Sequence, residues 1–208
     1  MPEKEKYLER IIEEVKKSLG NRPKQSISHR ADHPTRVWQR AKNLAFIIME
    51  KKDIIVDMEI LEIACRVHDL DESYEGKKAD HVVRSMVEGE LLLHKVNYPK
   101  HRIQRVLQII SEHSSEDIKT PSSIEAKILF DADKLDGLGA IGIARVFALC
   151  GQQGLSIEES ISWYRSKIKK AMPHIQTEVG REIAERDLRY TNSFLEKIEE
   201  EKALLEIV

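Results

Sequence analysis

The sequence has few cysteines and few aromatic residues, no long apolar run, and no excess of charge of one sign. Its two cysteines, Cys65 and Cys150, stand apart in apolar surroundings, which favours buried free thiols over a disulfide or a cysteine-based metal site. With 34 basic and 36 acidic side chains the net charge is −2, so we expect no broad surface for polynucleotides or anionic membranes. No run reaches the roughly 20 apolar residues of a membrane span, and the start MPEKEKYLERII is typical of a charged amphipathic helix. We therefore expect a soluble, cytoplasmic protein.

Apolar residues recur at three-to-four spacing along nearly the whole chain, which is the period of an α-helix. The first helix should end at Gly20, and further helices are predicted over 32–50, 57–69, 79–95 and 100–113. A capping box, Ser122-x-x-Glu125, opens a helix that continues through Ala148. A second box, Ser156-x-x-Glu159, opens another, and a last long helix follows Pro173. The pattern predicts an all-α fold of roughly eight helices.

The adjacent pair His68-Asp69, in ACRVHDLDES, closes an apolar helical stripe. A carboxylate at such a place costs free energy unless it is paired or bound to a metal. His33 lies upstream and Asp133 lies downstream, each on another predicted helix. Helical bundles build metal sites from inward-facing side chains on separate helices, and a nitrogen and oxygen donor set without sulfur suits Mn²⁺, Mg²⁺, Fe²⁺, Co²⁺, Ni²⁺ or a catalytic Zn²⁺. The sequence therefore predicts one divalent metal ion with open coordination positions.

The order His … His-Asp … Asp resembles the HD superfamily of metal-dependent phosphohydrolases. The stretch DADKLDGLGAIGIAR, together with DHPTRV, is similar to a branch of small single-domain HD hydrolases. The resemblance covers about residues 24–150 and implies an HD-type helical bundle whose metal ligands are His33, His68, Asp69 and Asp133. Asp131 stays open as an alternative to Asp133, which we prefer because the family's last aspartate usually follows a small residue.

From the length of the chain we expect one HD-type domain over 1–208, with the metal-site core at about 24–150 and a C-terminal helical extension at about 155–208. The resemblance implies an enzyme in which metal-activated water cleaves a phosphomonoester or phosphoanhydride. The expected partner is a small phosphorylated substrate, in the first place a nucleotide; a homodimer stays an open alternative. A different class of function is a nucleotide-sensing or interaction module on an HD scaffold without turnover.

Several polar residues near the doublet are candidates for chemistry. Asp69 and Glu72 are the predicted catalytic residues, because related nucleotidases place an acid that orients water three residues after the doublet. Phosphate needs cationic or hydrogen-bonding partners. The candidates for substrate binding are Arg36, one helical turn from His33, two loop lysines and a histidine that ends a helix: Lys77, Lys78 and His113. His81 and His94 could support a second metal, but we expect a mononuclear site.

The segment after Asp133 also contains patterns of other protein classes. Gly137, Gly139 and Gly142 spell G-x-G-x-x-G, but a dinucleotide site needs a preceding strand, so close helix packing is the better interpretation. The run ILFDAD resembles the nucleophile strand of haloacid-dehalogenase-like phosphatases. That family needs an α/β sheet, which this helical pattern does not predict.

Overall fold

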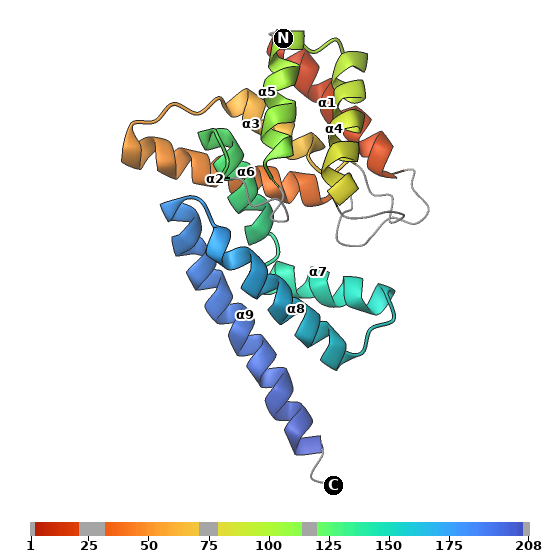
Figure 1. Cartoon of the computed structure of the whole chain (residues 1–208), viewed down its shortest axis with the longest axis vertical. Helices are drawn as coiled ribbons and strands as arrows, with labels where there is room; N and C mark the ends of the chain where they lie inside the picture. The colour runs from red at the N-terminus through yellow and green to blue at the C-terminus, as the bar shows by residue number, and fades with distance from the viewer. Residues whose placement is uncertain (1–2, 21–31, 71–78, 114–119, 206–208) are drawn as a thin grey trace.

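Every regular element in the described part of the chain is helical. The computed structural model describes residues 3–20, 32–70, 79–113 and 120–205 (Figure 1). Within these ranges the α-helices are α1 (Glu3–Gly20), α2 (Asp32–Lys52), α3 (Met58–Val67), α4 (Ala79–Lys95), α5 (Lys100–Ser111), α6 (Ile124–Leu135), α7 (Gly139–Gln152), α8 (Ile157–Ala171) and α9 (Glu178–Leu205). A short 3-10 turn, η2 (Met172–His174), separates the last two. The all-α prediction is confirmed.

The helices form two parts that meet at α6 and α9. In Figure 1, α1 to α6 pack together in the upper part, while α7, α8 and α9 lie below them, with α9 running down to the C-terminus. The upper part has an extended apolar core, and α2 packs there against both α3 and α6. The lower helices have a small core of their own, made of Ile143, Ile161, Tyr164 and Leu195. Because α2, α3 and α6 share one core, side chains at their ends are held at fixed separations.

The predicted continuous helix from Ser122 to Ala148 is wrong. It is divided into α6 and α7, and the chain bends by 67° between the two helices. Gly139 has a φ of +69°, and a Cβ on Gly142 would lie 2.3 Å from the carbonyl carbon of Gly137, so the bend requires glycine. The packing interpretation of the glycines is thereby supported. No single described helix is long and apolar enough to cross a membrane; only the bent α6–α7 pair passes on length and composition.

The predicted capping boxes differ in outcome. The box at Ser156 is confirmed, because both of its reciprocal hydrogen bonds are present. The first box is wrong by one residue: Ser123, and not Ser122, caps α6 with its side chain. Glu125 instead accepts a hydrogen bond of 2.9 Å from the backbone N–H of Asp57, the residue that caps α3. Glu125 thus binds the N-terminus of α3, whereas a capping box would have used it at the N-terminus of its own helix, α6.

Asp131 of α6 forms hydrogen bonds with the segment that leads into α9. Its buried carboxylate accepts hydrogen bonds from the backbone N–H groups of Gln176 and Thr177, at 2.7 and 2.8 Å, and from Thr177 Oγ1 at 2.6 Å. Burial raises the pKa of Asp131, against the effect of these hydrogen bonds. Gly180 lies beside this contact, since a Cβ there would come within 2.3 Å of Asp131 Oδ2. Both oxygens of Asp131 are therefore engaged by the two residues that precede α9.

We predict that Gly180→Ala destabilises the protein, although the same change usually stabilises a helix. The added methyl group must displace the Asp131 carboxylate, which should lower the free energy of unfolding by about 1–3 kcal/mol. Gly151→Ala in α7 is the matched control, because no atom lies within 4 Å of its added Cβ, and it should be neutral or stabilising by up to about 1 kcal/mol. Denaturant unfolding measures both; a stabilised Gly180→Ala would contradict the tight contact.

Candidate metal centre

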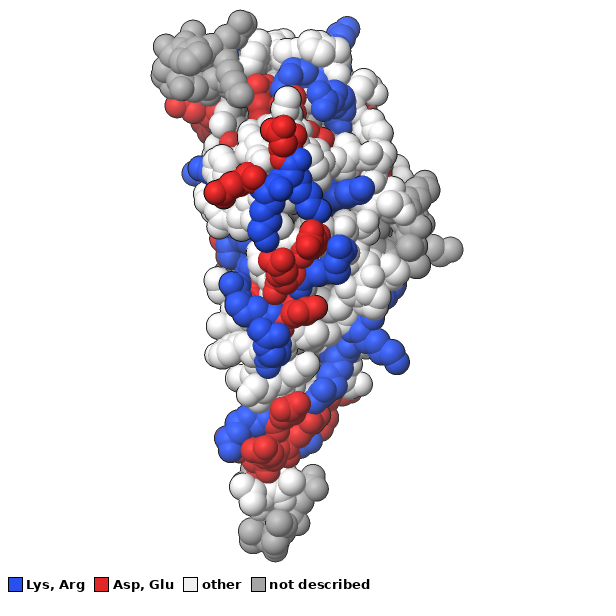
Figure 2. Space-filling view, turned by 90° about the vertical axis from the view of Figure 1, so that its left-hand side faces the viewer, with Lys and Arg blue, Asp and Glu red and all other residues white. Residues whose placement is uncertain are grey.

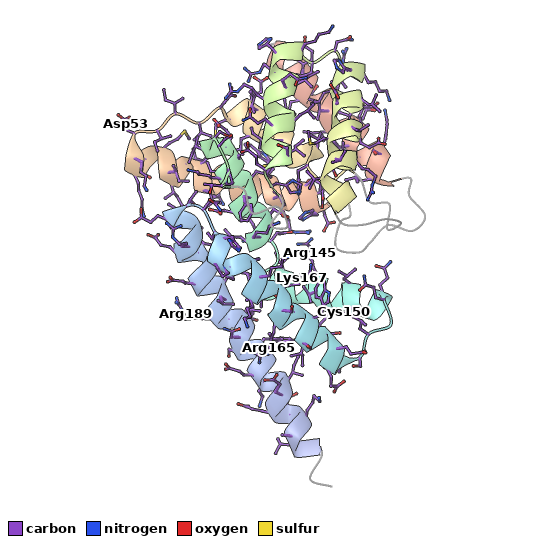
Figure 3. All side chains as sticks on the ribbon, in the orientation of Figure 1. Asp53, Arg145, Cys150, Arg165, Lys167 and Arg189 are labelled. Carbon is purple, nitrogen blue, oxygen red and sulfur yellow. The ribbon has the colours of Figure 1, made fainter. Side chains whose placement is uncertain are left out.

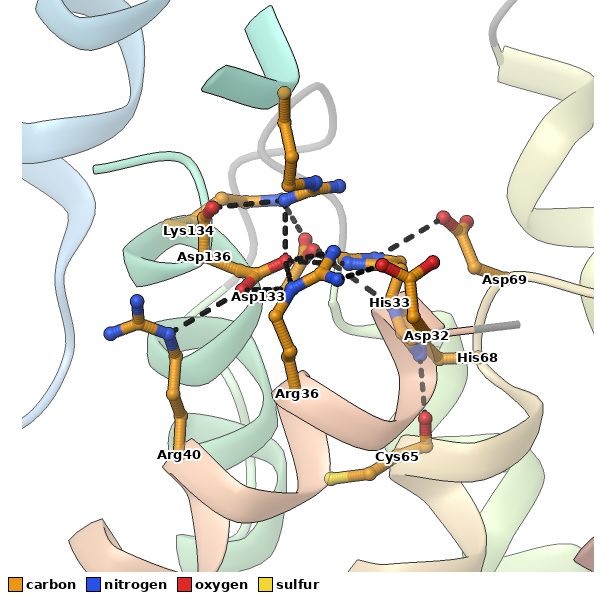
Figure 4. A network of polar contacts seen from close by, with 11 residues as sticks. Asp32, His33, Arg36, Arg40, Cys65, His68, Asp69, Asp133, Lys134 and Asp136 are labelled. Carbon is orange, nitrogen blue, oxygen red and sulfur yellow. Dashed lines mark hydrogen bonds and ion pairs between the residues drawn. The ribbon is translucent and has the colours of Figure 1, made fainter. Parts of the chain in front are cut away.

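Three helices bring metal-binding side chains to one place. His33 is the second residue of α2, His68 caps the C-terminus of α3, and Asp133 lies in α6. One ligand atom from each of the three lies within 4.8 Å of the others. Both histidines are buried, and the Asp133 side chain is 17% exposed. Residues 100 positions apart in the sequence therefore form one compact polar cluster (Figure 4).

The distances inside the cluster leave room for an ion rather than for direct hydrogen bonds. Asp133 Oδ1 lies 3.5 Å from His33 Nε2 and 3.8 Å from His68 Nε2. Asp69 approaches from the other side, with its Oδ2 at 3.7 Å from His33 Nε2. Figure 4 shows the Asp69 side chain directed toward His33. Ordinary N–H···O hydrogen bonds are about 2.9 Å long, so these side chains are too far apart to hydrogen-bond one another directly and leave a gap between their donor atoms.

Hydrogen bonds at the outer ring nitrogens orient the imidazoles. His68 Nδ1 donates to the carbonyl oxygen of Cys65 at 3.0 Å, and His33 Nδ1 lies 2.9 Å from Asp136 Oδ2. A carbonyl can only accept, so the Nδ1 of His68 carries the proton and its Nε2 lone pair points into the cluster. This Nε2 is buried without a hydrogen-bond partner among the described residues. Burying such an atom costs free energy that a metal ion would offset.

The charges of the cluster favour an ionised carboxylate. Burial raises the pKa of Asp133, but Lys134 and the two histidines outweigh burial and hold it well below its usual range. Burial lowers the pKa of His33, whereas the neighbouring carboxylates of Asp133 and Asp136 raise it to about 9. Two imidazole nitrogens and a carboxylate oxygen make a mixed donor set that fits Mn²⁺, Mg²⁺, Fe²⁺, Co²⁺, Ni²⁺ or Zn²⁺. The residues present therefore fit a divalent ion.

Asp136 supports the cluster from behind. This fully buried carboxylate contacts His33, accepts from Arg36 Nε at 3.0 Å, and is also bound by Arg145 of α7. Arg40 Nε lies 3.5 Å from its Oδ1. Figure 4 shows Arg36 and Arg40 reaching Asp136 from α2, and Figure 3 places Arg145 where α6 gives way to the lower helices. The carboxylate thus joins α2, α6 and α7 and fixes the His33 ring.

The other predicted site residues are placed as follows. His113 is buried, and its ring centroid lies 5.2 Å from that of His68; burial, His68 and Lys134 lower its pKa to about 4. Arg36 points to Asp136 and Asp32. Lys77, Lys78 and Glu72 lie outside the described residues.

Asp136 and Lys134 were not recognised as site residues from the sequence. Asp136 follows Asp133 by three positions, which places both on one face of a helical turn, and this spacing was the available signal. Lys134 donates to Asp133 Oδ2 at 2.7 Å. Neighbouring residues on a helix point in different directions, so nothing in the sequence indicated that contact.

We predict that Asp136→Asn makes unfolding less sensitive to acid. Burial raises the pKa of Asp136, but the hydrogen bond from His33 and the charge of Arg145 outweigh it and lower the pKa from 3.8 to about 2. A depressed carboxylate pKa stabilises the fold above pH 3.8, and this contribution is lost as the pH falls through about 2. Unfolding free energy measured between pH 5 and 2 should therefore fall by about 2 kcal/mol more in the wild type than in Asp136→Asn.

Asp32→Asn is the control for that measurement, because Asp32 contacts the same Arg36 from an exposed position. An exposed pair contributes little to stability, so this variant should follow the wild type. Equal acid profiles for the wild type and Asp136→Asn would contradict the role of Asp136.

Known proteins share both the sequence pattern and the fold. The HD domain family matches residues 30–138 of this chain. The uncharacterized protein YpgQ of Bacillus subtilis is 32% identical over 170 residues, which covers 78% of this chain and 80% of YpgQ. The crystal structure of YpgQ in complex with ADP superposes with a TM-score of 0.70 and 26% identity, covering 93% of this chain and 97% of the other.

A second solved structure extends the comparison to another species. It is described as an HD-superfamily hydrolase from Bacillus thuringiensis, and it is 28% identical with a TM-score of 0.70. The superposition covers 96% of this chain and 98% of the other. The matched residues 30–138 include His33, His68, Asp69 and Asp133. This chain therefore belongs to the HD domain family.

Proposed function

We propose that this protein is a metal-dependent phosphohydrolase and that His33, His68, Asp69 and Asp133 hold its divalent ion. The observation that carries the proposal is the convergence of two buried imidazoles and a carboxylate, with donor atoms within 4.8 Å of one another. A divalent ion bound by such donors acidifies a water ligand and polarises a phosphoryl oxygen. The description of the Bacillus thuringiensis protein as a hydrolase supports the same activity.

The residues of the chain supply the surroundings of that reaction. Asp136 keeps the His33 ring in the orientation that ligation requires, and the carbonyl of Cys65 does the same for His68. His113 stays neutral near pH 7, because its pKa is lowered to about 4. Its Nδ1 donates to the carbonyl oxygen of Ile110 at 2.6 Å, so its Nε2 can accept a hydrogen bond beside the ion. In this proposal Glu72 is the acid that orients water, and Arg36, Lys77 and Lys78 bind phosphate.

We propose a nucleotide as the substrate. The support is the ADP bound to YpgQ of Bacillus subtilis, which shares the fold of this chain over most of its length. Basic and acidic side chains are mixed over the face shown in Figure 2, which suits a small substrate better than a long polyanion. The mixture is consistent with the net charge of −2.

Hydrolysis of a nucleotide panel by chelator-treated protein, with added Mn²⁺, Mg²⁺, Co²⁺ or Ni²⁺, tests the proposal. We expect phosphate or pyrophosphate release that depends on the metal. The double variant His68→Ala with Asp69→Ala should lose at least about 100-fold in rate, because it removes two ligands. His94→Ala is the matched control, since this histidine is exposed at the end of α4, and its rate should equal that of the wild type.

Two results would contradict the proposal. One is the absence of hydrolysis with every metal and nucleotide, and the other is an undiminished rate in the double variant. Nucleotide binding without any turnover would favour the sensing module instead.

A further inference from the structure

The carboxylate of Asp133 has different neighbours at its two oxygens. Its Oδ1 faces the histidines, at 3.5 Å from His33 Nε2 and 3.8 Å from His68 Nε2. Its Oδ2 accepts a hydrogen bond of 2.7 Å from the ammonium group of Lys134. The Asp133 carboxylate therefore lies between the ammonium group and the two histidine nitrogens; Figure 4 labels all four residues.

Lys134 is held in place and is not a freely solvated surface lysine. Its side chain is only 16% exposed, and its Nζ lies 5.3 Å from the centre of the Phe130 ring. A lysine in this position holds a positive charge directly against the carboxylate that faces the two histidines.

A positive charge here works against the cation that the site would bind. The ammonium group competes for Asp133 and repels a divalent ion at short range in a poorly solvated site. A neutral residue in its place would leave the carboxylate wholly to the ion. An anion that contacts both the ammonium group and the divalent ion would offset the repulsion between them. A phosphoryl group can do this because it has several oxygens.

We propose that Lys134 is a substrate-contacting residue whose ammonium group binds a phosphoryl oxygen beside the divalent ion. This inference rests on the proposed hydrolase function. The arginines of the site bind a different carboxylate, because Arg36 and Arg145 both direct their guanidinium groups to Asp136, behind the His33 ring. Lys134 instead contacts the carboxylate that faces both histidines.

Calorimetric titration of the full chain tests the inference with binding as the readout. Mn²⁺ is titrated first without phosphate, and inorganic phosphate is then titrated into the Mn²⁺-loaded protein. We expect Lys134→Met to bind Mn²⁺ as tightly as the wild type or up to about tenfold more tightly, and to bind phosphate at least about tenfold more weakly. A loss of phosphate affinity without any loss of Mn²⁺ affinity distinguishes a phosphate contact from a merely structural lysine.

Three further variants complete the comparison. Lys134→Arg keeps the charge and should retain phosphate affinity to within about threefold. Lys134→Gln is a second neutral variant, in case the methionine perturbs folding, and should behave as Lys134→Met. Lys127→Met changes another half-buried lysine of α6, two turns away, and should leave both affinities unchanged.

The outcomes separate this inference from the function on which it rests. Unchanged phosphate affinity in both neutral variants, or no phosphate binding by the Mn²⁺-loaded wild type, would overturn the role of Lys134. Weaker Mn²⁺ binding in the neutral variants would also overturn it, because Lys134 would then act by orienting Asp133. If the wild type binds no Mn²⁺, the proposed function itself fails, and the inference fails with it.

Discussion

The buried carboxylate of Asp136 is the constraint on which the site depends. A charge removed from water must be matched by partners, and Asp136 finds them in His33, Arg36 and Arg145. These partners come from α2 and α7, whereas Asp136 itself follows the last residue of α6. Satisfying one charge therefore fixes the relative positions of three helices and the orientation of one imidazole.

The bend between α6 and α7 makes this arrangement possible. A straight helix would carry Arg145 away from Asp136, whereas the turn at the glycines brings it back. The lower helices stabilise the turn: Tyr164 of α8 donates to the carbonyl of Gly137 at 2.7 Å, and Gly139 donates to Thr191 of α9 at 2.9 Å. The C-terminal helices thus take part in the site without contributing a donor to the cluster of His33, His68 and Asp133.

Local patterns predicted the helices well and the turn poorly. Apolar spacing and the box at Ser156 are properties of a short segment, and the structure confirms them. The bend at Gly139 was missed, because its cause is the contact of Gly142 with Gly137 and hydrogen bonds from distant helices. The predicted cap of α6 was wrong for a similar reason, because Glu125 binds the backbone of Asp57 at the start of α3.

The same distinction holds for the candidate site. The doublet His68-Asp69 indicated a cluster because two polar residues closed an apolar stripe, and the structure brings His33 and Asp133 to it. The preference for Asp133 over Asp131 gains a physical reason from the fold, because the segment that leads into α9 already engages both oxygens of Asp131. Asp136 is engaged by residues 100 or more positions away as well as by a near one, and sequence order does not reveal such partners.

The central claim is that a divalent ion lies between His33, His68 and Asp133. Anomalous diffraction from crystals of the chain grown with Mn²⁺ tests it most directly. The account predicts one manganese peak at bonding distance, about 2.0–2.3 Å, from Nε2 of both histidines and from an oxygen of Asp133. A peak on Asp131 instead, or no peak among the three residues in crystals that contain Mn²⁺, would contradict it.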